Sequence, residues 1–411
     1  MPTHSINELV ERAEARRRAL ADRPPPLPLR YWRQQAHFTT PASDPSMARK
    51  AVERGTESMG KTLERWAITP GMLAGRLGLP PRQVEALLAA PRRAPLVMLD
   101  GEDAQALRED VAERGRLTAV NVLREADWGT CLRFYRPPGA SLPGAAKTLV
   151  SVLYEAGQGR NPAEYPLDGI IFPKIERLEE LAWVMQTLSD VEAALGLPPN
   201  RIRLGLLIES GGAVARLEAL VEQSLPRLCA LIFGLVDYAA DLGLTAINTR
   251  HPIAEWARAA IINAAGAAGV PAIDSMTIDY PVAQAGLSDD ANRTRILDRI
   301  ALAYEDARHG LELGMSGKWV GHPAQLFAVL LAFEASVDDA TLEREAAKLR
   351  AYRVAEEQEG RGATIIDGVM SDRATDRQAR EVLRRAVAWG RFDQDEALKL
   401  GVITPEEVET K

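Results

Sequence analysis

Cysteine and net positive charge are both scarce in this sequence. Cys131 and Cys229 are its only cysteines, too few for a disulfide scaffold, and they lie in apolar stretches where we expect inert core side chains. Few cysteines also indicate the reducing cytoplasm. The 50 lysines and arginines are outnumbered by 57 aspartates and glutamates, and the formal net charge is −7. A nucleic-acid-binding protein usually has a basic face, so we expect no nucleic acid partner.

Long apolar segments are absent as well. The longest apolar runs, such as LCALIFGLV (228–236), have the length of a strand and fall well short of the roughly 20 residues that span a bilayer. The N-terminal segment MPTHSINELVERAEARRRAL has a charged amphipathic helix pattern without the apolar centre of a signal peptide. We therefore expect a cytoplasmic protein that makes no contact with a membrane.

The sequence does contain enough apolar residues for a large core. Hydrophobic residues make up 46% and charged residues 26% of the 411 positions, as in ordinary soluble globular proteins. From Ala94 onward, short apolar runs alternate with amphipathic helix patterns, which predicts a parallel sheet covered by helices. The strand candidates are 94–100, 118–123, 132–136, 168–175, 202–210, 228–237 and, more weakly, 271–276 and 318–323.

The number of strand candidates favours a closed (β/α)8 barrel, the TIM barrel of the α/β class. The alternative is an open, doubly wound sheet, but no Gly-rich dinucleotide-binding motif follows any strand candidate. We predict three regions along the chain. They are an N-terminal helix with a Pro-rich connector (1–30), the barrel as catalytic domain (31–335, with a helical insertion at 56–94) and a C-terminal helical segment (336–411) with a hairpin turning at Asp367-Gly368.

Catalytic sites of parallel α/β proteins lie at the carboxyl ends of the strands. Polar residues that end the strand candidates therefore predict an acidic rim with a few cations. These residues are Asp100, Glu102, Asp103, Arg133, Arg136, Lys174, Glu176, Glu209, Asp237 and Asp274. Among them, we expect Glu102, Asp103, Lys174 and Asp274 to contact a substrate.

Glu209 and Asp237 are the strongest candidates for a metal site. They lie one βα unit apart and would end neighbouring strands. Two such carboxylates repel each other unless a positive charge lies between them, and Mg²⁺ or Mn²⁺ accepts oxygen ligands of this kind. The backbone N–H groups of Gly211 and Gly212, at the start of the next helix, suit a substrate carboxylate. The alternative is that each acid pairs with a neighbouring lysine or arginine.

Each cation of the rim has two possible roles, one in the site and one in the structure. Arg133 and Arg136 either hold an anion or an enolate, or lie on the surface. Lys174 is a site cation or pairs with the glutamate two positions later, and a Schiff-base role is the least favoured. His251 and His322 each precede a proline, and we expect them to form helix caps or structural hydrogen bonds. No His/Cys spacing indicates zinc.

Eight sequence blocks carry a resemblance to a known family. The blocks are TTPASDPSMARKA (39–51), MLDGEDA (98–104), LRFYR (132–136), DGIIFPKIE (168–176), LLIESGGAV (206–214), LIFGLVDYAADLG (231–243), RHPIAEWARAAIINAAGAAGVPAID (250–274) and GMSGKWVGHPAQL (314–326). In this order they resemble the citrate lyase beta-subunit-like family, which includes the malyl-CoA and citramalyl-CoA lyases of the HpcH/HpaI aldolase superfamily.

The resemblance implies a (β/α)8 barrel that binds Mg²⁺ through Glu209 and Asp237. The substrate-binding arginine of the family falls on Arg133, with Arg136 as the alternative if the register differs. The C-terminal segment of the family acts as a lid that often reaches the site of a neighbouring subunit. Its catalytic aspartate falls on Asp372, in DGVMSD (367–372). A homo-oligomer, trimeric or hexameric, is implied as well.

The implied activity is cleavage of a carbon–carbon bond. A 3-hydroxyacyl-CoA such as malyl-CoA, methylmalyl-CoA or citramalyl-CoA would give an acyl-CoA and a 2-keto acid, glyoxylate or pyruvate, or form from them by Claisen-type condensation. Two alternatives remain: an aldolase acting on free acids without CoA, and a non-catalytic homologue in which Arg133 and Asp372 do not converge on the metal. The chain departs from the family in its greater length and in Gly101, where an apolar residue is common.

Overall fold

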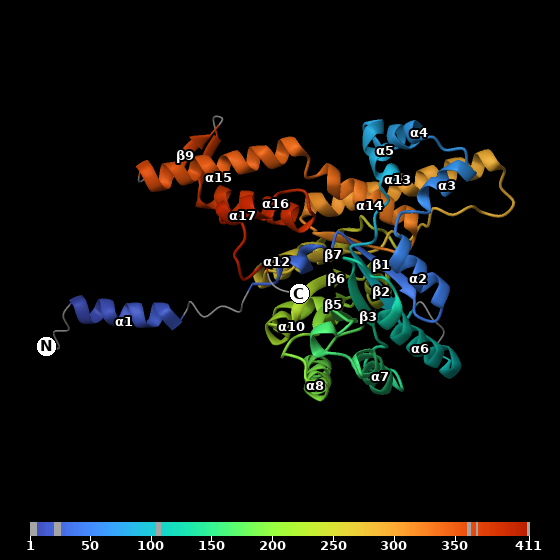
Figure 1. The fold of residues 1–411 in the computed structure, drawn as a ribbon, viewed down its shortest axis with the longest axis horizontal. Coiled ribbons are helices and arrows are strands. Elements are labelled where there is room, and N and C mark those ends of the chain that lie inside the picture. Colours follow the sequence, from blue (N-terminus) through green and yellow to red (C-terminus); the bar gives the residue numbers. More distant parts are fainter. Residues whose placement is uncertain (1–5, 20–25, 104–107, 360–362, 367–368, 409–411) are drawn as a thin grey trace.

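Eight parallel strands form a closed barrel in sequence order, from β1 to β8 (Figure 1). This computed structural model describes residues 6–19, 26–103, 108–359, 363–366 and 369–408. The barrel confirms the predicted (β/α)8 fold and excludes the open sheet. Its strands are β1 (Ala36–Pro41), β2 (Leu96–Asp100), β3 (Leu132–Arg136), β4 (Gly169–Phe172), β5 (Arg203–Ile208), β6 (Leu228–Phe233), β7 (Ala272–Asp274) and β8 (Gly317–Val320).

One strand prediction is wrong. Residues 118–123 lie inside helix α6 (Glu109–Glu125), where the apolar side chains of Ala119, Val122 and Leu123 are buried on one face. A short apolar run without flanking turn residues fits a helix as well as a strand, and here the helical spacing decides. β1 takes the place of the missing strand, in a stretch for which only the family resemblance predicted one.

The helices cover the barrel and extend beyond it. The inserted helices after β1 are α2 (Pro45–Arg54), α3 (Met59–Arg65), α4 (Pro70–Leu77) and α5 (Pro81–Ala89). Besides α6, the later barrel helices are α7 (Ala145–Gly157), η2 (Pro162–Glu164), α8 (Leu178–Leu195), α9 (Gly211–Ala215), α10 (Leu217–Ser224), α11 (Leu235–Asp241), α12 (Pro252–Ala268), α13 (Asp289–Leu313) and α14 (Pro323–Ala335). Among the described residues, no helix is long and apolar enough to cross a membrane.

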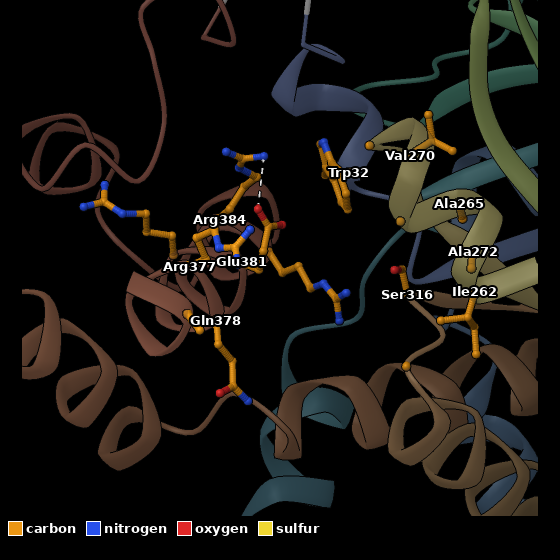
Figure 2. A pocket seen from close by; sticks show the side chains of 16 residues that line it. Trp32, Ile262, Ala265, Val270, Ala272, Ser316, Arg377, Gln378, Glu381 and Arg384 are labelled. Atoms are coloured by element: carbon orange, nitrogen blue, oxygen red, sulfur yellow. Dashed lines mark ion pairs between the residues drawn. The ribbon is translucent and has the colours of Figure 1, made fainter. Parts of the chain in front are cut away.

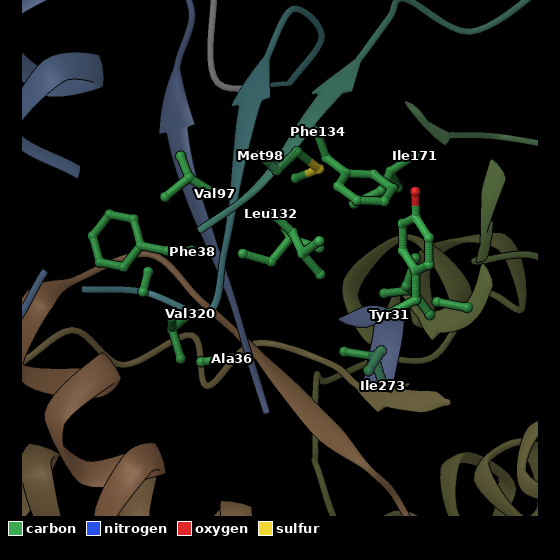
Figure 3. Close-up of a cluster of buried hydrophobic side chains, with 14 of the residues drawn as sticks. Tyr31, Ala36, Phe38, Val97, Met98, Leu132, Phe134, Ile171, Ile273 and Val320 are labelled. Atoms are coloured by element: carbon green, nitrogen blue, oxygen red, sulfur yellow. The ribbon is translucent and has the colours of Figure 1, made fainter. Parts of the chain in front are cut away.

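Apolar side chains fill the barrel interior, as Figure 3 shows for Phe38, Met98, Phe134 and their neighbours. Both cysteines are buried and free, and burial raises the pKa of each thiol to about 12, which confirms that they are core side chains. The two histidines behave as predicted. Nδ1 of His251 accepts from the amide of Ile253 at 3.3 Å, and Nδ1 of His322 accepts from that of Ala324 at 3.2 Å, so both cap helices.

The N-terminal segment consists of α1 (Ile6–Ala19) and the short η1 (Leu29–Trp32). The C-terminal segment contains α15 (Asp339–Glu359), the antiparallel pair β9 (Ala363–Ile366) and β10 (Val369–Asp372), α16 (Arg373–Ala388) and α17 (Gln394–Lys399). The expected turn at Asp367-Gly368 lies outside the described residues.

The C-terminal segment packs against η1. Nε1 of Trp389 donates to the carbonyl oxygen of Trp32 at 3.2 Å, and the amide of Leu29 donates to the carbonyl of Glu407 at 2.8 Å. Because η1 precedes β1, these contacts lie at the amino-terminal face of the barrel. The C-terminal segment therefore does not cover the mouth of its own barrel, formed by the carboxyl ends of the strands.

Candidate active site

Glu209 follows the last residue of β5 and points into the mouth of the barrel. Its Oε1 accepts from the backbone N–H of Lys174 at 2.7 Å, and only 3% of the residue is exposed. A Cβ atom on Gly234 would lie 2.6 Å from the Cβ of Glu209, so the glycine makes room for the carboxylate. Burial raises the pKa of Glu209 to about 8, against the lowering effect of Lys174.

Lys174 joins the two predicted metal ligands. It follows β4 with a left-handed φ of 52°, a strained conformation for a residue with a side chain, and this turns its N–H toward Glu209. Its Nζ lies 2.7 Å from Oδ1 of Asp237, in α11, rather than at Glu176. Burial opposes the ammonium, but the hydrogen bond to Asp237 and the charge of Glu209 outweigh it, and the pKa of Lys174 is raised.

Arg136 is the last residue of β3 and lies opposite Asp100, the last residue of β2. Its Nε and Nη2 donate to the two carboxylate oxygens of Asp100 at 2.7 and 2.6 Å. The guanidinium carbon lies 5.3 Å from the centre of the Trp319 ring, and Nε1 of Trp319 donates to Oγ1 of Thr39. Both ends of the bidentate pair are buried, so the guanidinium is fixed in the barrel mouth.

Glu102 and Asp103 complete the acidic side of the site. Nη1 of Arg136 lies 3.4 Å from Oε2 of Glu102 and 3.2 Å from Oδ2 of Asp103, and Nζ of Lys174 lies 3.6 Å from the same Asp103 oxygen. Both carboxylate oxygens of Glu102 are buried without a hydrogen-bond partner. Burial raises the pKa of Glu102 to about 7, and Arg136 limits the rise.

These residues fit a divalent cation. Five carboxylates, Asp100, Glu102, Asp103, Glu209 and Asp237, surround the two cations Lys174 and Arg136. If all are ionised, the cluster has three more negative than positive charges. Among the described residues, no group of three or more His, Cys, Asp or Glu side chains is arranged to hold a metal unaided. Mg²⁺ needs only one or two protein carboxylates and takes its other ligands from water and substrate.

The expectation for Arg133 needs correction. It is the second residue of β3, three positions before the carboxyl end, so about 10 Å of strand separates it from the rim. Its amide donates to Oδ2 of Asp168 at 2.9 Å, and its guanidinium lies over the ring of Trp128. Only a residue at the end of a strand reaches the mouth, and in β3 that residue is Arg136.

Asp274 and the glycine pair after Glu209 already have protein partners. Asp274 is buried, accepts from Nε of Arg258 at 2.7 Å and lies 3.3 Å from Nζ of Lys318; burial opposes its charge, but these cations outweigh it and lower its pKa. The amide of Gly211 donates to Oδ2 of Asp241 at 2.7 Å. Gly212 follows in the short helix α9. Neither Asp274 nor Gly211 therefore offers a free group to a substrate in this arrangement.

Asp372 lies far from this cluster along the fold. It is the N-cap of α16, where its carboxylate accepts from the amides of Ala374 and Thr375 at 2.9 and 3.1 Å. These hydrogen bonds lower its pKa. Because α16 packs at the amino-terminal face, Asp372 and Glu209 belong to opposite ends of one barrel.

Comparison with known proteins places the chain in a family. Residues 146–411, more than half of the chain, match the family described as "Domain of unknown function (DUF6986)". The chain belongs to this family. The "L-malyl-CoA/beta-methylmalyl-CoA lyase" of Cereibacter sphaeroides (strain ATCC 17025 / ATH 2.4.3) is 29% identical over 313 residues, which cover 72% of this chain and 89% of that protein. The human "Citramalyl-CoA lyase, mitochondrial" is 26% identical over 304 residues, covering 71% and 78%.

Solved structures of other proteins have a fold similar to that of this DUF6986 member. A citrate lyase from Burkholderia xenovorans LB400 has a TM-score of 0.59 at 21% identity and covers 92% of this chain and 97% of its own. The malate synthase of Haloferax volcanii has a TM-score of 0.51 at 17% identity and covers 89% and 94%. The two curated relatives above are named as lyases of malyl-CoA and citramalyl-CoA, which confirms the predicted resemblance and agrees with the predicted class, a carbon–carbon lyase.

Four residues of this DUF6986 member contribute to the rim and were not among the predicted site residues. Trp319 supports Arg136, Gly234 makes room for Glu209, and Arg258 and Lys318 neutralise Asp274. Trp319 and Lys318 stand in a strand candidate, so the sequence held a signal for them. Arg258 lies in the middle of a helix pattern, and its contact with β7 exists only in the folded chain.

Proposed function

We propose that this protein is a divalent-metal-dependent lyase that cleaves a 3-hydroxyacyl-CoA to an acyl-CoA and a 2-keto acid, or condenses them. The observation that carries the proposal is the convergence of Glu209, Asp237 and Arg136 on the barrel mouth, in a cluster where the carboxylates outnumber the cations. The named relatives are lyases of malyl-CoA and citramalyl-CoA, which supports a CoA thioester as substrate.

Glu209 and Asp237 would hold the metal, Mg²⁺ by preference and Mn²⁺ as the alternative. When bound, the metal supplies Lewis-acid polarisation of the substrate oxygens and a template for their orientation. Lys174 then has to release Asp237, and its ammonium is already within 3.6 Å of Oδ2 of Asp103, which can accept it. Lys174 is thus the cation that a bound metal would replace at Asp237.

Arg136 would stabilise the negative charge that develops on the thioester oxygen. When the carbon–carbon bond breaks, the 3-hydroxyl gives its proton to a carboxylate of the cluster, and the bond's electrons move to the CoA fragment as an enolate. A guanidinium fixed by Asp100 and Trp319 stabilises that oxygen without reorganising. The enolate carbon then takes up a proton, and we assign this transfer to Asp372 of a neighbouring copy in a homo-oligomer, whose carboxylate first takes up the proton from water.

A second function is favoured by one observation. A non-catalytic homologue predicts that Arg133 and Asp372 do not converge on Glu209, and within one chain they do not. The lyase proposal assigns the role expected of Arg133 to Arg136. It also has Asp372 of one subunit act in the site of another. The two hypotheses therefore differ in whether the purified protein turns over any substrate.

The test is a mass-spectrometric assay with Mg²⁺ and a panel of malyl-CoA, β-methylmalyl-CoA, citramalyl-CoA and free hydroxy-keto acids. Glu209→Gln should abolish cleavage, whereas Glu218→Gln, an exposed glutamate of α10, should leave it unchanged. Cleavage of a CoA thioester supports the proposal. Cleavage of free acids alone would replace it with an aldolase, and no turnover with Mg²⁺ or Mn²⁺ would favour the non-catalytic homologue.

A further inference from the structure

A cleft of about 580 Å³ separates α16 from the amino-terminal face of the barrel. Figure 2 shows Arg377, Glu381 and Arg384 of α16 on one side, and Trp32 and Val270 on the other. The barrel side is formed by the end of α12 and by the residues that precede β7 and β8, and it carries no charged side chain among the lining residues. The cleft thus has one charged wall and one neutral wall.

The charged wall consists mainly of arginines. Its charged residues are Arg377, Arg380, Glu381, Arg384 and Arg385. Arg380 is engaged with Asp376, with Nε and Oδ2 2.7 Å apart. Arg384 lies 3.3 Å from Glu381 and 3.4 Å from Glu407. Together with Glu381, the neighbouring Asp376 and Glu407 give three acids against four arginines, an excess of one positive charge.

Arg385 has no counter-charge in contact with it among the described residues. Its Nε is buried and has no hydrogen-bond partner. Burial lowers its pKa, and Glu381 is the acid that opposes this effect. A half-buried guanidinium whose Nε has no hydrogen-bond partner costs free energy, so an anion in the cleft would complete the site.

A second cavity of about 560 Å³ adjoins the first. The two share Trp32, Val270 and Arg384 among their lining residues. The second cavity is lined largely by apolar residues, including Leu27, and its second arginine is Arg203. A ligand that fills both has an anionic part near Arg384 and Arg385 and a less polar part beyond Trp32.

We propose that this cleft binds a nucleoside phosphate, with its phosphates at Arg384 and Arg385 and its nucleoside in the adjoining cavity. Arginine binds phosphate oxygens through paired N–H donors, and an aromatic ring beside an apolar wall suits a base. The site lies at the opposite end of the barrel from Glu209, so it is separate from the candidate active site and does not rest on the proposed lyase activity.

The test is isothermal titration calorimetry of the full chain with ADP, pyrophosphate and adenosine. We expect ADP to bind more tightly than either fragment, and Arg385→Gln and Arg384→Gln each to weaken ADP at least tenfold. Arg344→Gln, which removes the same charge from α15 outside the cleft, should change the affinity less than twofold. Lyase turnover should be unchanged in all three variants.

Three results would overturn the assignment. Unchanged ADP affinity in both variants would mean that ADP binds elsewhere, the barrel mouth included. Adenosine binding as tightly as ADP would exclude the arginine contacts, and pyrophosphate binding as tightly as ADP would exclude the nucleoside from the second cavity. Arg384 is only partly buried, so its variant carries the test even if Arg385→Gln fails to fold.

Discussion

Metal binding at the barrel mouth should depend steeply on pH because of Glu209. A carboxyl group has to lose its proton to bind a metal, and burial raises the pKa of Glu209 to about 8. With that pKa, the ionised form makes up about one tenth of the molecules at pH 7 and about one hundredth at pH 6. The association constant for Mg²⁺ should therefore rise about tenfold per pH unit between pH 6 and 7.5, and level off above pH 8.

Titration calorimetry measures both the affinity for Mg²⁺ and the number of protons released on binding. At pH 7, repeated in buffers of different ionisation enthalpy, Mg²⁺ should release about 0.9 proton per site from Glu209, with a smaller share from Glu102, whose pKa burial raises to about 7. Glu209→Gln should lose most of this release and bind Mg²⁺ far more weakly, while Glu218→Gln should match the wild type. An affinity that does not change between pH 6 and 8, or binding without proton release, would refute the reasoning.

Three further predictions concern the same cluster and its partner subunit. Arg136→Met or Asp100→Asn should each lower the free energy of unfolding by about 3–5 kcal/mol, measured in urea, and the double variant should lose less than their sum, because each single change leaves a buried charge or dipole unpaired. Gly234→Ala should push the Glu209 side chain from its place, and reduce turnover by about a hundredfold with the circular dichroism spectrum unchanged; normal turnover would show that the carboxylate has room to move. Glu209→Gln and Asp372→Asn should each be inactive alone and recover about a quarter of wild-type activity when the two variants are mixed and reassembled. The reason is that a site formed by two subunits is intact in about one of four random pairings. No recovery would place both residues in the site of one subunit.

The sequence predicts the barrel well because the signal is local. Near-continuous apolar runs such as 228–233 are buried on both faces of a parallel sheet, and the turn residues after them mark the carboxyl ends. The wrong prediction at 118–123 concerns a short apolar run whose pattern fits the period of a helix as well as that of a strand. Acids that follow the strands, such as Glu209, were found for the same local reason.

The partners of those acids are harder to predict because they depend on three-dimensional register. Asp274 ends a strand as Asp237 does, yet Arg258 and Lys318 neutralise it, whereas Asp237 has a lysine from the loop after β4. Arg133 and Arg136 are three residues apart, and only the strand's bounds decide which one reaches the mouth. The spacing of residues along the chain predicts neither which cation pairs with an acid nor which arginine reaches the mouth.

The position of Asp372 is the strongest physical argument for an oligomer. A proton donor has to reach the substrate within hydrogen-bond distance. Asp372, however, is the N-cap of α16, and α16 packs on the face opposite Glu209. Refolding the C-terminal segment onto its own mouth would break the contacts of Trp389 and Glu407 with η1. Contact with a second copy needs no such loss, so the reaction proposed here, if Asp372 takes part in it, requires at least two chains.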